Sequence, residues 1–299
     1  MRISTCIPHA TLQVGVILSA TGLHGHHIPR TVRIGQEGGT FEALAFSAPW
    51  LEQALDAPLS AWAVRLAHAD GGDQLPILLG LEDEPFSSGL KYLPDEVCPV
   101  AGTVVRIKEL ISEIKTHPLR IFVTNVFQRR DVVNAFWMMP ASGRDHHSYP
   151  GGLAVHSCEV ADDLSVHLGL TEVEADLGIA GSLLHDIGKV WSYTDDMFPN
   201  AASLAMGHEL VGLCRLEPEL ARLEQAWPDG AYVMRSLLSG NSRMRENGSL
   251  PSALLQRIKA CDQRSCERER TANGFRRMSR PVWTPSAWED RPTPVIFEP

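Results

Sequence analysis

Two patterns of hydrophobic and polar residues meet near residue 100. Before it, short apolar runs with partial alternation are separated by glycine- and aspartate-rich turns, which is typical of β-strands. The predicted strands cover residues 12–19, 30–34, 40–46, 61–67 and 75–81. A helical turn is predicted over residues 48–54, and residues 82–99 resemble a linker. The pattern predicts a small β-rich domain, a barrel or a sandwich, with a linker, over residues 1–99.

After residue 100, apolar residues recur at the spacing of helices that bury one face. The predicted helices cover residues 104–115, 119–138, 152–168, 171–186, 203–213, 217–227, 231–238 and 251–270. Five prolines among the last 19 residues exclude regular helix there. We therefore predict an α+β protein: the β-rich domain, a mainly α-helical domain over residues 100–278, and a proline-rich extended tail over residues 279–299.

Composition narrows the function classes. The chain has 299 residues, of which 44% are hydrophobic, so a sizeable core is expected. A net charge of −9 argues against a general DNA coat protein. Residues 255–280 nevertheless hold eight Lys or Arg against three Asp or Glu, which indicates either an anion-facing surface or a solvated helix face.

The cysteines and the hydropathy of the chain indicate the cellular compartment that we expect. The six cysteines have no metal-binding or disulfide spacing, so we expect reduced thiols and a cytoplasmic protein. No apolar run approaches the ~20 residues that a membrane helix needs, so no membrane partner is expected.

Four polar side chains interrupt the apolar helices of the second half. His185 and Asp186 stand side by side at the end of one predicted helix, His156 lies on the helix before it, and Asp262 lies in the last helix. Imidazole and carboxylate groups are ligands of divalent metal ions, and burying them unpaired costs several kcal/mol. Three packed helices could bring the four groups together, so the sequence predicts a metal site in a helical core.

The arrangement His156 … His185-Asp186 … Asp262 resembles the HD superfamily of metal-dependent phosphohydrolases, over about residues 100–270. The string from His146 to Ser157, with Tyr-Pro-Gly-Gly inside it, is similar to two subgroups. One is the YhaM-like 3′–5′ exoribonucleases, in which a small OB-type β-barrel precedes the HD domain. The other is the TraI relaxases (MobH type) of conjugative elements. The order of domains fits the first subgroup, and the string is at least as similar to the second.

The resemblance implies a role for each matching residue. The metal ligands would be His156, His185, Asp186 and Asp262. The ion, one of Mn²⁺, Mg²⁺, Ni²⁺, Fe²⁺ or Zn²⁺, would lower the pKa of a water and generate a hydroxide nucleophile. Asp186 could bridge to a second ion. Lys189 would neutralise a phosphate oxygen in the transition state, and His208 stands where the family often has a further catalytic or ligating histidine.

One departure leaves the second ion open. The chain has no histidine after His208, where many two-metal members have another. His146 or His147 could substitute, and Arg264 and Arg268 are further candidates for phosphate contacts.

Three functional hypotheses follow. The first is a metal-dependent phosphodiesterase acting on single-stranded RNA or DNA, either exonuclease-like or relaxase-like. The second is a nucleotide or cyclic-nucleotide phosphohydrolase. The third is a non-catalytic nucleic-acid-binding or scaffold protein with a decayed HD site.

Overall fold

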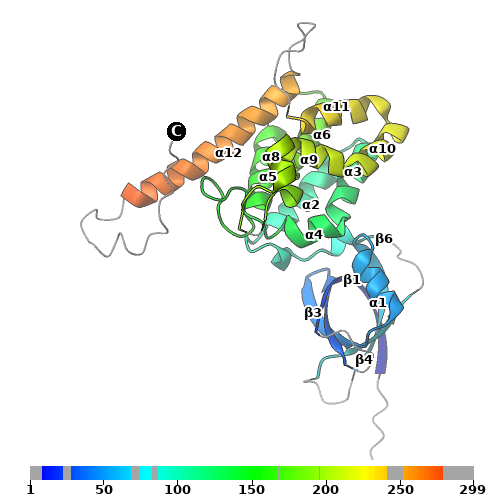
Figure 1. Ribbon diagram of the computed structural model, residues 1–299. Coiled ribbons are helices and arrows are strands. Elements are labelled where there is room, and N and C mark those ends of the chain that lie inside the picture. The colour runs from blue at the N-terminus through cyan, green and yellow to red at the C-terminus, as the bar shows by residue number, and fades with distance from the viewer. Residues whose placement is uncertain are drawn as a thin grey trace, which may run out of the picture.

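The computed structural model describes residues 9–22, 28–68, 74–82, 87–166, 169–194, 196–240 and 252–278. A β-barrel forms the N-terminal part and helices form the rest (Figure 1). The predicted mixed α+β organisation, strands first and helices after, is therefore confirmed. The predicted proline-rich tail over 279–299 lies outside the described residues.

Five strands close into a ring in the N-terminal part. Their bounds are β1 His9–Thr21, β2 Arg30–Gln36, β3 Gly39–Ala45, β4 Ser60–His68 and β5 Ile77–Leu81, with a two-residue β6 at Ser87–Ser88. Neighbours in the ring run β1-β2-β3-β5-β4, and β4 pairs back with β1. All these pairings are antiparallel except β3 with β5. Helix α1 (Pro49–Asp56) connects β3 to β4.

The length of β1 makes the closure possible. Residues 9–15 pair with β4, and residues 16–21 pair with β2. Gly15 stands where the strand changes partner, and a Cβ there would lie 2.7 Å from the Ile34 side chain. Alternating residues of the strands, among them Val32 and Val64, fill the barrel interior. The alternation seen in the sequence therefore serves a closed barrel.

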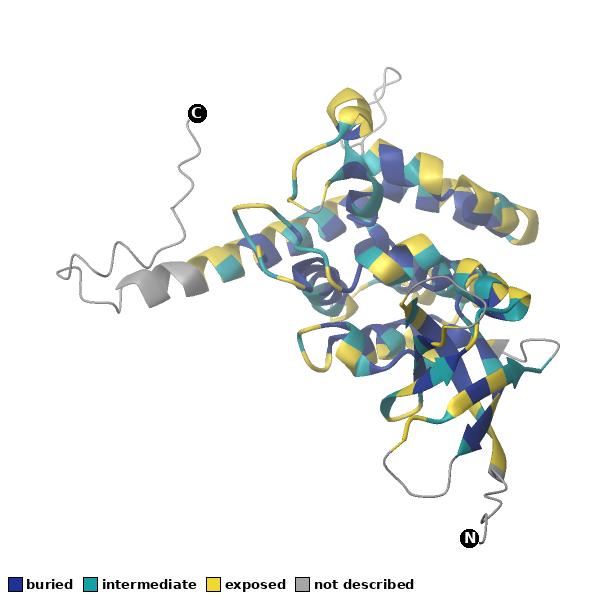
Figure 2. Cartoon of the chain, turned by 60° about the horizontal axis from the view of Figure 1, so that its bottom comes forward, coloured by how far each residue is buried: buried dark blue, intermediate teal, exposed yellow. Residues whose placement is uncertain are grey.

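Helices make up most of the C-terminal part (Figure 1). The single-turn helices η1 (Gly89–Tyr92) and η2 (Asp95–Val97) come first. The α-helices are α2 Thr103–Glu113, α3 His117–Gln128, α4 Arg130–Ala135, α5 Gly152–Ser165, α6 Glu172–Leu184, α7 Lys189–Ser192, α8 Ala201–Met206, α9 His208–Arg215, α10 Glu217–Ala226, α11 Pro228–Leu238 and α12 Ala253–Met278. Their inward faces are buried (Figure 2). Helices α5, α6 and α12 pack against one another. Among the described residues, no helix is both long and apolar enough to cross a membrane.

Three expectations about elements were wrong. Residues 119–138 are not one helix, because the backbone is extended at Arg129, between α3 and α4. Residues 203–213 are also interrupted, at Gly207, whose φ of 82° lies in the left-handed region. The supposed linker is packed: η1 and η2 fall within residues 82–99, and Leu90 and Leu93 are buried. At Arg129 and in the supposed linker, tertiary contacts outweigh the local pattern, whereas at Gly207 the glycine itself ends α8.

Arg130 connects the helical part to the barrel. Its guanidinium donates hydrogen bonds to the carbonyl oxygens of Ile17 (2.8 Å), Ala54 (2.5 Å) and Ala57 (2.7 Å). Burial lowers the pKa of Arg130 to about 10, so the group stays charged at neutral pH. The helix break at Arg129 therefore coincides with a contact between the two parts.

We expect Arg130→Ala to lower the free energy of unfolding by about 2–4 kcal/mol, because charged hydrogen bonds of this kind contribute about 1.5–3 kcal/mol and three carbonyls lose their donor. Chemical denaturation measures the change. Arg65→Ala is the control, since its ion pair with Glu82 is exposed and should contribute under about 1 kcal/mol. Equal losses in the two variants would contradict the assigned role.

Candidate metal centre

Three helices bring the four predicted metal ligands together. His156 lies on α5, and His185 and Asp186 follow directly after α6. Asp262 lies on α12, which packs on both of those helices. His156 and Asp186 are buried, whereas Asp262 is partly exposed. The predicted residues therefore meet, and among them Asp262, on α12, is the most exposed to solvent.

The distances from the two histidines to each other and to the two carboxylates are close to those around one ion. His156 Nε2 lies 3.3 Å from His185 Nε2, 3.2 Å from Asp262 Oδ1 and 3.6 Å from Asp186 Oδ2. His185 Nε2 lies 3.4 Å from Asp186 Oδ2 and 4.0 Å from Asp262 Oδ1. With bonds of about 2.1 Å, neighbouring ligand atoms of a tetrahedral ion are about 3.4 Å apart. His156, His185 and Asp262 could therefore hold a divalent ion, since one ligand atom of each lies within 4.8 Å of the others. Asp186 Oδ2 lies beside both histidines as a further candidate ligand.

Hydrogen bonds set which nitrogen of each histidine is free. His185 Nδ1 lies 2.7 Å from the carbonyl oxygen of Ser182, so it carries the proton and donates it. The Ser265 hydroxyl donates to Glu159 Oε2 (2.7 Å), so it accepts from His156 Nδ1 at 3.0 Å. Both Nε2 atoms are left with a lone pair toward the centre. Burial also lowers the pKa of His156, which favours the neutral ring that a metal requires.

The Ser265–Glu159 pair was not predicted from the sequence, and it gives a test. We expect Ser265→Ala to weaken metal binding by about 10- to 100-fold, as loss of a partner that orients a ligating histidine usually does. Calorimetric titration of the metal-free protein measures this. Ser157→Ala is the matched control, because Ser157 is buried next to His156 and its hydroxyl has no hydrogen-bond partner. If both variants bind metal equally well, the Ser265–Glu159 pair has no role in metal binding.

Asp186 is the most heavily engaged ligand. Its Oδ2 accepts a hydrogen bond from Lys189 Nζ at 2.6 Å, and its Oδ1 lies 2.9 Å from His208 Nε2. Burial by itself would raise the pKa of this carboxyl, but Lys189, His185 and His208 together hold the pKa well below its usual value. Asp186 is therefore a carboxylate at neutral pH. His208, predicted as catalytic, contacts the Asp186 oxygen that faces away from the other candidate ligands, and so holds this carboxylate in place.

Lys189 lies against the candidate ligands, in contact with Asp186. Its ammonium also donates to the carbonyl oxygen of Ala141 at 2.7 Å, and the side chain is buried. Burial would lower the pKa of Lys189, but the neighbouring Asp186 raises it, so the ammonium stays charged.

Gly188 stands directly before α7 and has an ordinary φ of −60°. Glycine is required there because a Cβ would lie 1.9 Å from the carbonyl oxygen of His208.

The remaining predicted histidines lie beside His156. The ring of His146 is 4.9 Å, and that of His147 5.3 Å, from the His156 ring, centre to centre. Burial and the neighbouring charges lower the pKa of His146 to about 4. His147 Nε2 faces Glu159 at 3.4 Å. His146 therefore offers a neutral ring near the centre, whereas His147 supports Glu159.

The sequence did not single out Cys266, which lies four residues after Asp262 on α12 and so on the same helix face. Its sulfur lies 3.5 Å from Asp262 Oδ1. Burial, with Asp262 nearby, raises the pKa of this thiol to about 12. The i,i+4 spacing from a ligand was the signal that could have found it.

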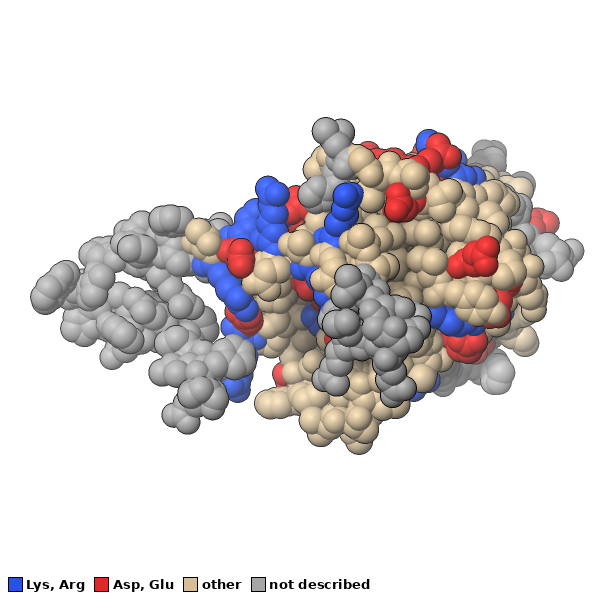
Figure 3. All heavy atoms as spheres, turned by 90° about the horizontal axis from the view of Figure 1, so that it is seen from above, with Lys and Arg blue, Asp and Glu red and all other residues tan. Residues whose placement is uncertain are grey.

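The two arginines proposed to contact phosphate are both paired with carboxylates. Arg264 lies 3.6 Å from Asp163, and Arg268 lies 3.3 Å from Glu159 and 3.4 Å from Asp163. Figure 3 shows basic and acidic side chains close together in the region of α12. The positive charge of Arg264 and Arg268 is therefore partly neutralised by carboxylates of α5.

No family model, curated protein or solved structure matches this chain.

Proposed function

We propose that the protein is an HD-type metal-dependent phosphohydrolase that cleaves phosphodiester bonds in single-stranded RNA or DNA. The observation that carries the proposal is the pair of His156 and His185 Nε2 atoms, 3.3 Å apart, each with its Nδ1–H already engaged. Two lone pairs that face each other repel unless a cation lies between them. Asp186 and Asp262 supply the negative charge that such an ion needs.

The residues around the ion have distinct tasks in this proposal. An ion held by the four ligands would lower the pKa of a water and make it a nucleophile at neutral pH. Lys189 would offer its third ammonium proton to a phosphate oxygen as negative charge builds up. His208 keeps Asp186 in place.

The N-terminal barrel supports a nucleic-acid substrate. Five strands in the ring order β1-β2-β3-β5-β4, with a helix between β3 and β4, are what an OB-type barrel has. Barrels of this type commonly bind single strands through grooves along the sheet. We propose that this barrel is OB-like and binds the substrate strand.

One observation favours a nucleotide phosphohydrolase as the second candidate. Arg264 and Arg268 are paired with Glu159 and Asp163, which weakens the basic track that a long polynucleotide would follow. A mononucleotide needs a pocket and no such track.

A substrate panel tests the proposal. Metal-depleted protein is supplied with Mn²⁺, Mg²⁺ or Ni²⁺ and incubated with end-labelled single-stranded RNA and DNA, and separately with nucleoside phosphates and cyclic nucleotides. We expect metal-dependent cleavage of the oligonucleotides. Turnover of the nucleotides without cleavage of oligonucleotides would favour the second candidate. Protein that binds no metal and cleaves nothing would indicate a decayed site.

A further inference from the structure

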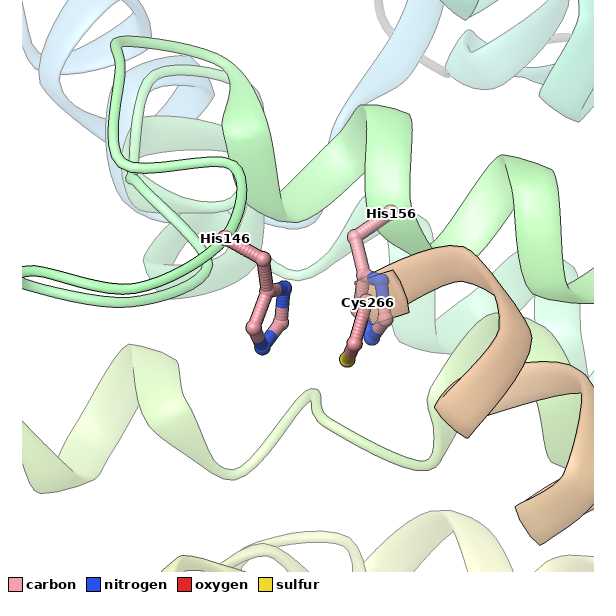
Figure 4. A group of neighbouring side chains, drawn as sticks. All are labelled: His146, His156 and Cys266. Atoms are coloured by element: carbon pink, nitrogen blue, oxygen red, sulfur yellow. The ribbon is translucent and has the colours of Figure 1, made fainter. Parts of the chain in front are cut away.

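A second group of ligands adjoins the centre and includes a sulfur. His146, His156 and Cys266 each offer one ligand atom, and these atoms all lie within 4.8 Å of one another. The three side chains come from the loop before α5, from α5 and from α12, and they point into the same space (Figure 4). The proposed phosphohydrolase does not use Cys266.

His156 belongs to both groups of ligands, and it has one free nitrogen. Its Nδ1 donates to Ser265, which leaves Nε2 for metal binding. One lone pair binds one ion, so an ion on the Cys266 side and an ion on the Asp186 side compete for the same atom. The two groups are therefore alternatives.

The two groups differ in chemistry. His156, His185, Asp186 and Asp262 offer nitrogen and oxygen, which suit ions such as Mn²⁺. His146, His156 and Cys266 offer two nitrogens and a sulfur, which suit thiophilic ions such as Zn²⁺ and Cd²⁺. Thiophilic ions are therefore expected to prefer the group with Cys266, and ions that prefer oxygen and nitrogen the group with Asp186.

We propose that His146, His156 and Cys266 form an alternative site for a thiophilic divalent ion, and that its occupation withdraws His156 from the hydrolytic centre. As the sulfur–metal bond forms, the thiol releases its proton to solvent and the ion keeps its charge. The inference rests on the proposed function in taking His156 as a ligand of the catalytic ion. A bound thiophilic ion would thus inhibit the enzyme, because it takes His156 away from the catalytic ion beside it.

Binding of Cd²⁺ and of Mn²⁺ to the metal-depleted protein tests this, with Cys266→Ala, Cys266→Ser and a control. Removing a direct ligand should cost at least as much affinity as removing an outer partner, about 10- to 100-fold. We therefore expect both Cys266 variants to lose about that much Cd²⁺ affinity, together with the ultraviolet sulfur-to-cadmium absorption. Their Mn²⁺ affinity should be unchanged.

Cys158→Ala is the matched control. Cys158 and Cys266 are each 8% exposed, and each lies beside an aspartate four residues away on its own helix. The control should keep Cd²⁺ affinity and the absorption. Cd²⁺ binding and absorption that survive in both Cys266 variants would overturn the inference. If the protein cleaves phosphoesters with Mn²⁺ but Cd²⁺ binding survives in both Cys266 variants, only this inference fails. If the protein cleaves no phosphoesters, the proposed function fails, and the Cd²⁺ result still decides whether the sulfur site exists.

Discussion

Asp186→Asn is expected to reduce turnover about a thousandfold or more and to reduce bound metal. The reason is that the carboxylate supplies one of the two negative charges around the ion, and several kcal/mol of transition-state stabilisation depend on that ion. Each ~1.4 kcal/mol corresponds to a factor of ten in rate. Elemental analysis of the purified protein, together with the cleavage assay, measures both effects. Asparagine keeps the shape of the side chain, so packing around His208 is preserved.

Two further variants separate ligand loss from unfolding. Asp262→Asn should also reduce turnover and bound metal. It should disturb folding less than Asp186→Asn, because the Asp262 side chain is 38% exposed and is not paired with a buried lysine. Asp176→Asn is the control, because Asp176 is also buried but binds the backbone at Lys115 and Thr116, where α3 begins. It should lower the melting temperature and keep the metal. Equal metal content in the wild type and in both centre variants would refute the assigned ligands.

Lys189→Met is expected to separate metal binding from turnover. Its ammonium lies 2.6 Å from the Asp186 oxygen that faces the other ligands, so its removal also removes a repulsion on the ion. Metal affinity should be retained or increased. Turnover should fall by about 10²- to 10³-fold, the usual effect of losing one donor to a developing anion.

The same variant should be less stable without metal. Removing one partner of a buried ion pair costs about 3–5 kcal/mol, because Asp186 is left buried and uncompensated. Added metal would restore much of that loss by binding the folded state. Melting temperatures with and without Mn²⁺ measure the difference.

Lys108→Met is the control, since the Lys108 ammonium also donates to the backbone, at the carbonyls of Lys91 and Leu93, but lies on α2 and has no part in the metal centre. A Lys189 variant that loses its metal would show that the ammonium organises the ligands instead of serving the substrate.

The order of the elements and the four ligands could be predicted because both depend on local features of the chain. Alternating apolar residues mark strands such as β2, and apolar residues at helical spacing mark helices such as α6. His156, His185, Asp186 and Asp262 stand out because charged or polar groups at buried helix positions need a partner. Three packed helices then suffice to bring them together.

Other features could not be predicted, because they depend on residues distant in the sequence. Arg129 and Gly207 interrupt helices that their neighbours favour. Ser265 and Glu159 are ordinary polar residues until α12 packs on α5 and places them beside His156. Arg264 and Arg268 read as a basic surface until the same packing pairs them with acids.

Residue types and spacing alone thus predicted a β-rich part followed by helices, and four candidate metal ligands that the fold brings together. They could do so because backbone periodicity and the cost of burying polar groups act over a few residues. The tertiary structure alone decided that the strands close into a ring and that the Lys189 ammonium reaches the carbonyl oxygen of Ala141. It also placed the Cys266 sulfur within reach of His156. Those outcomes depend on distances between segments far apart in the sequence, which packing of the whole chain determines.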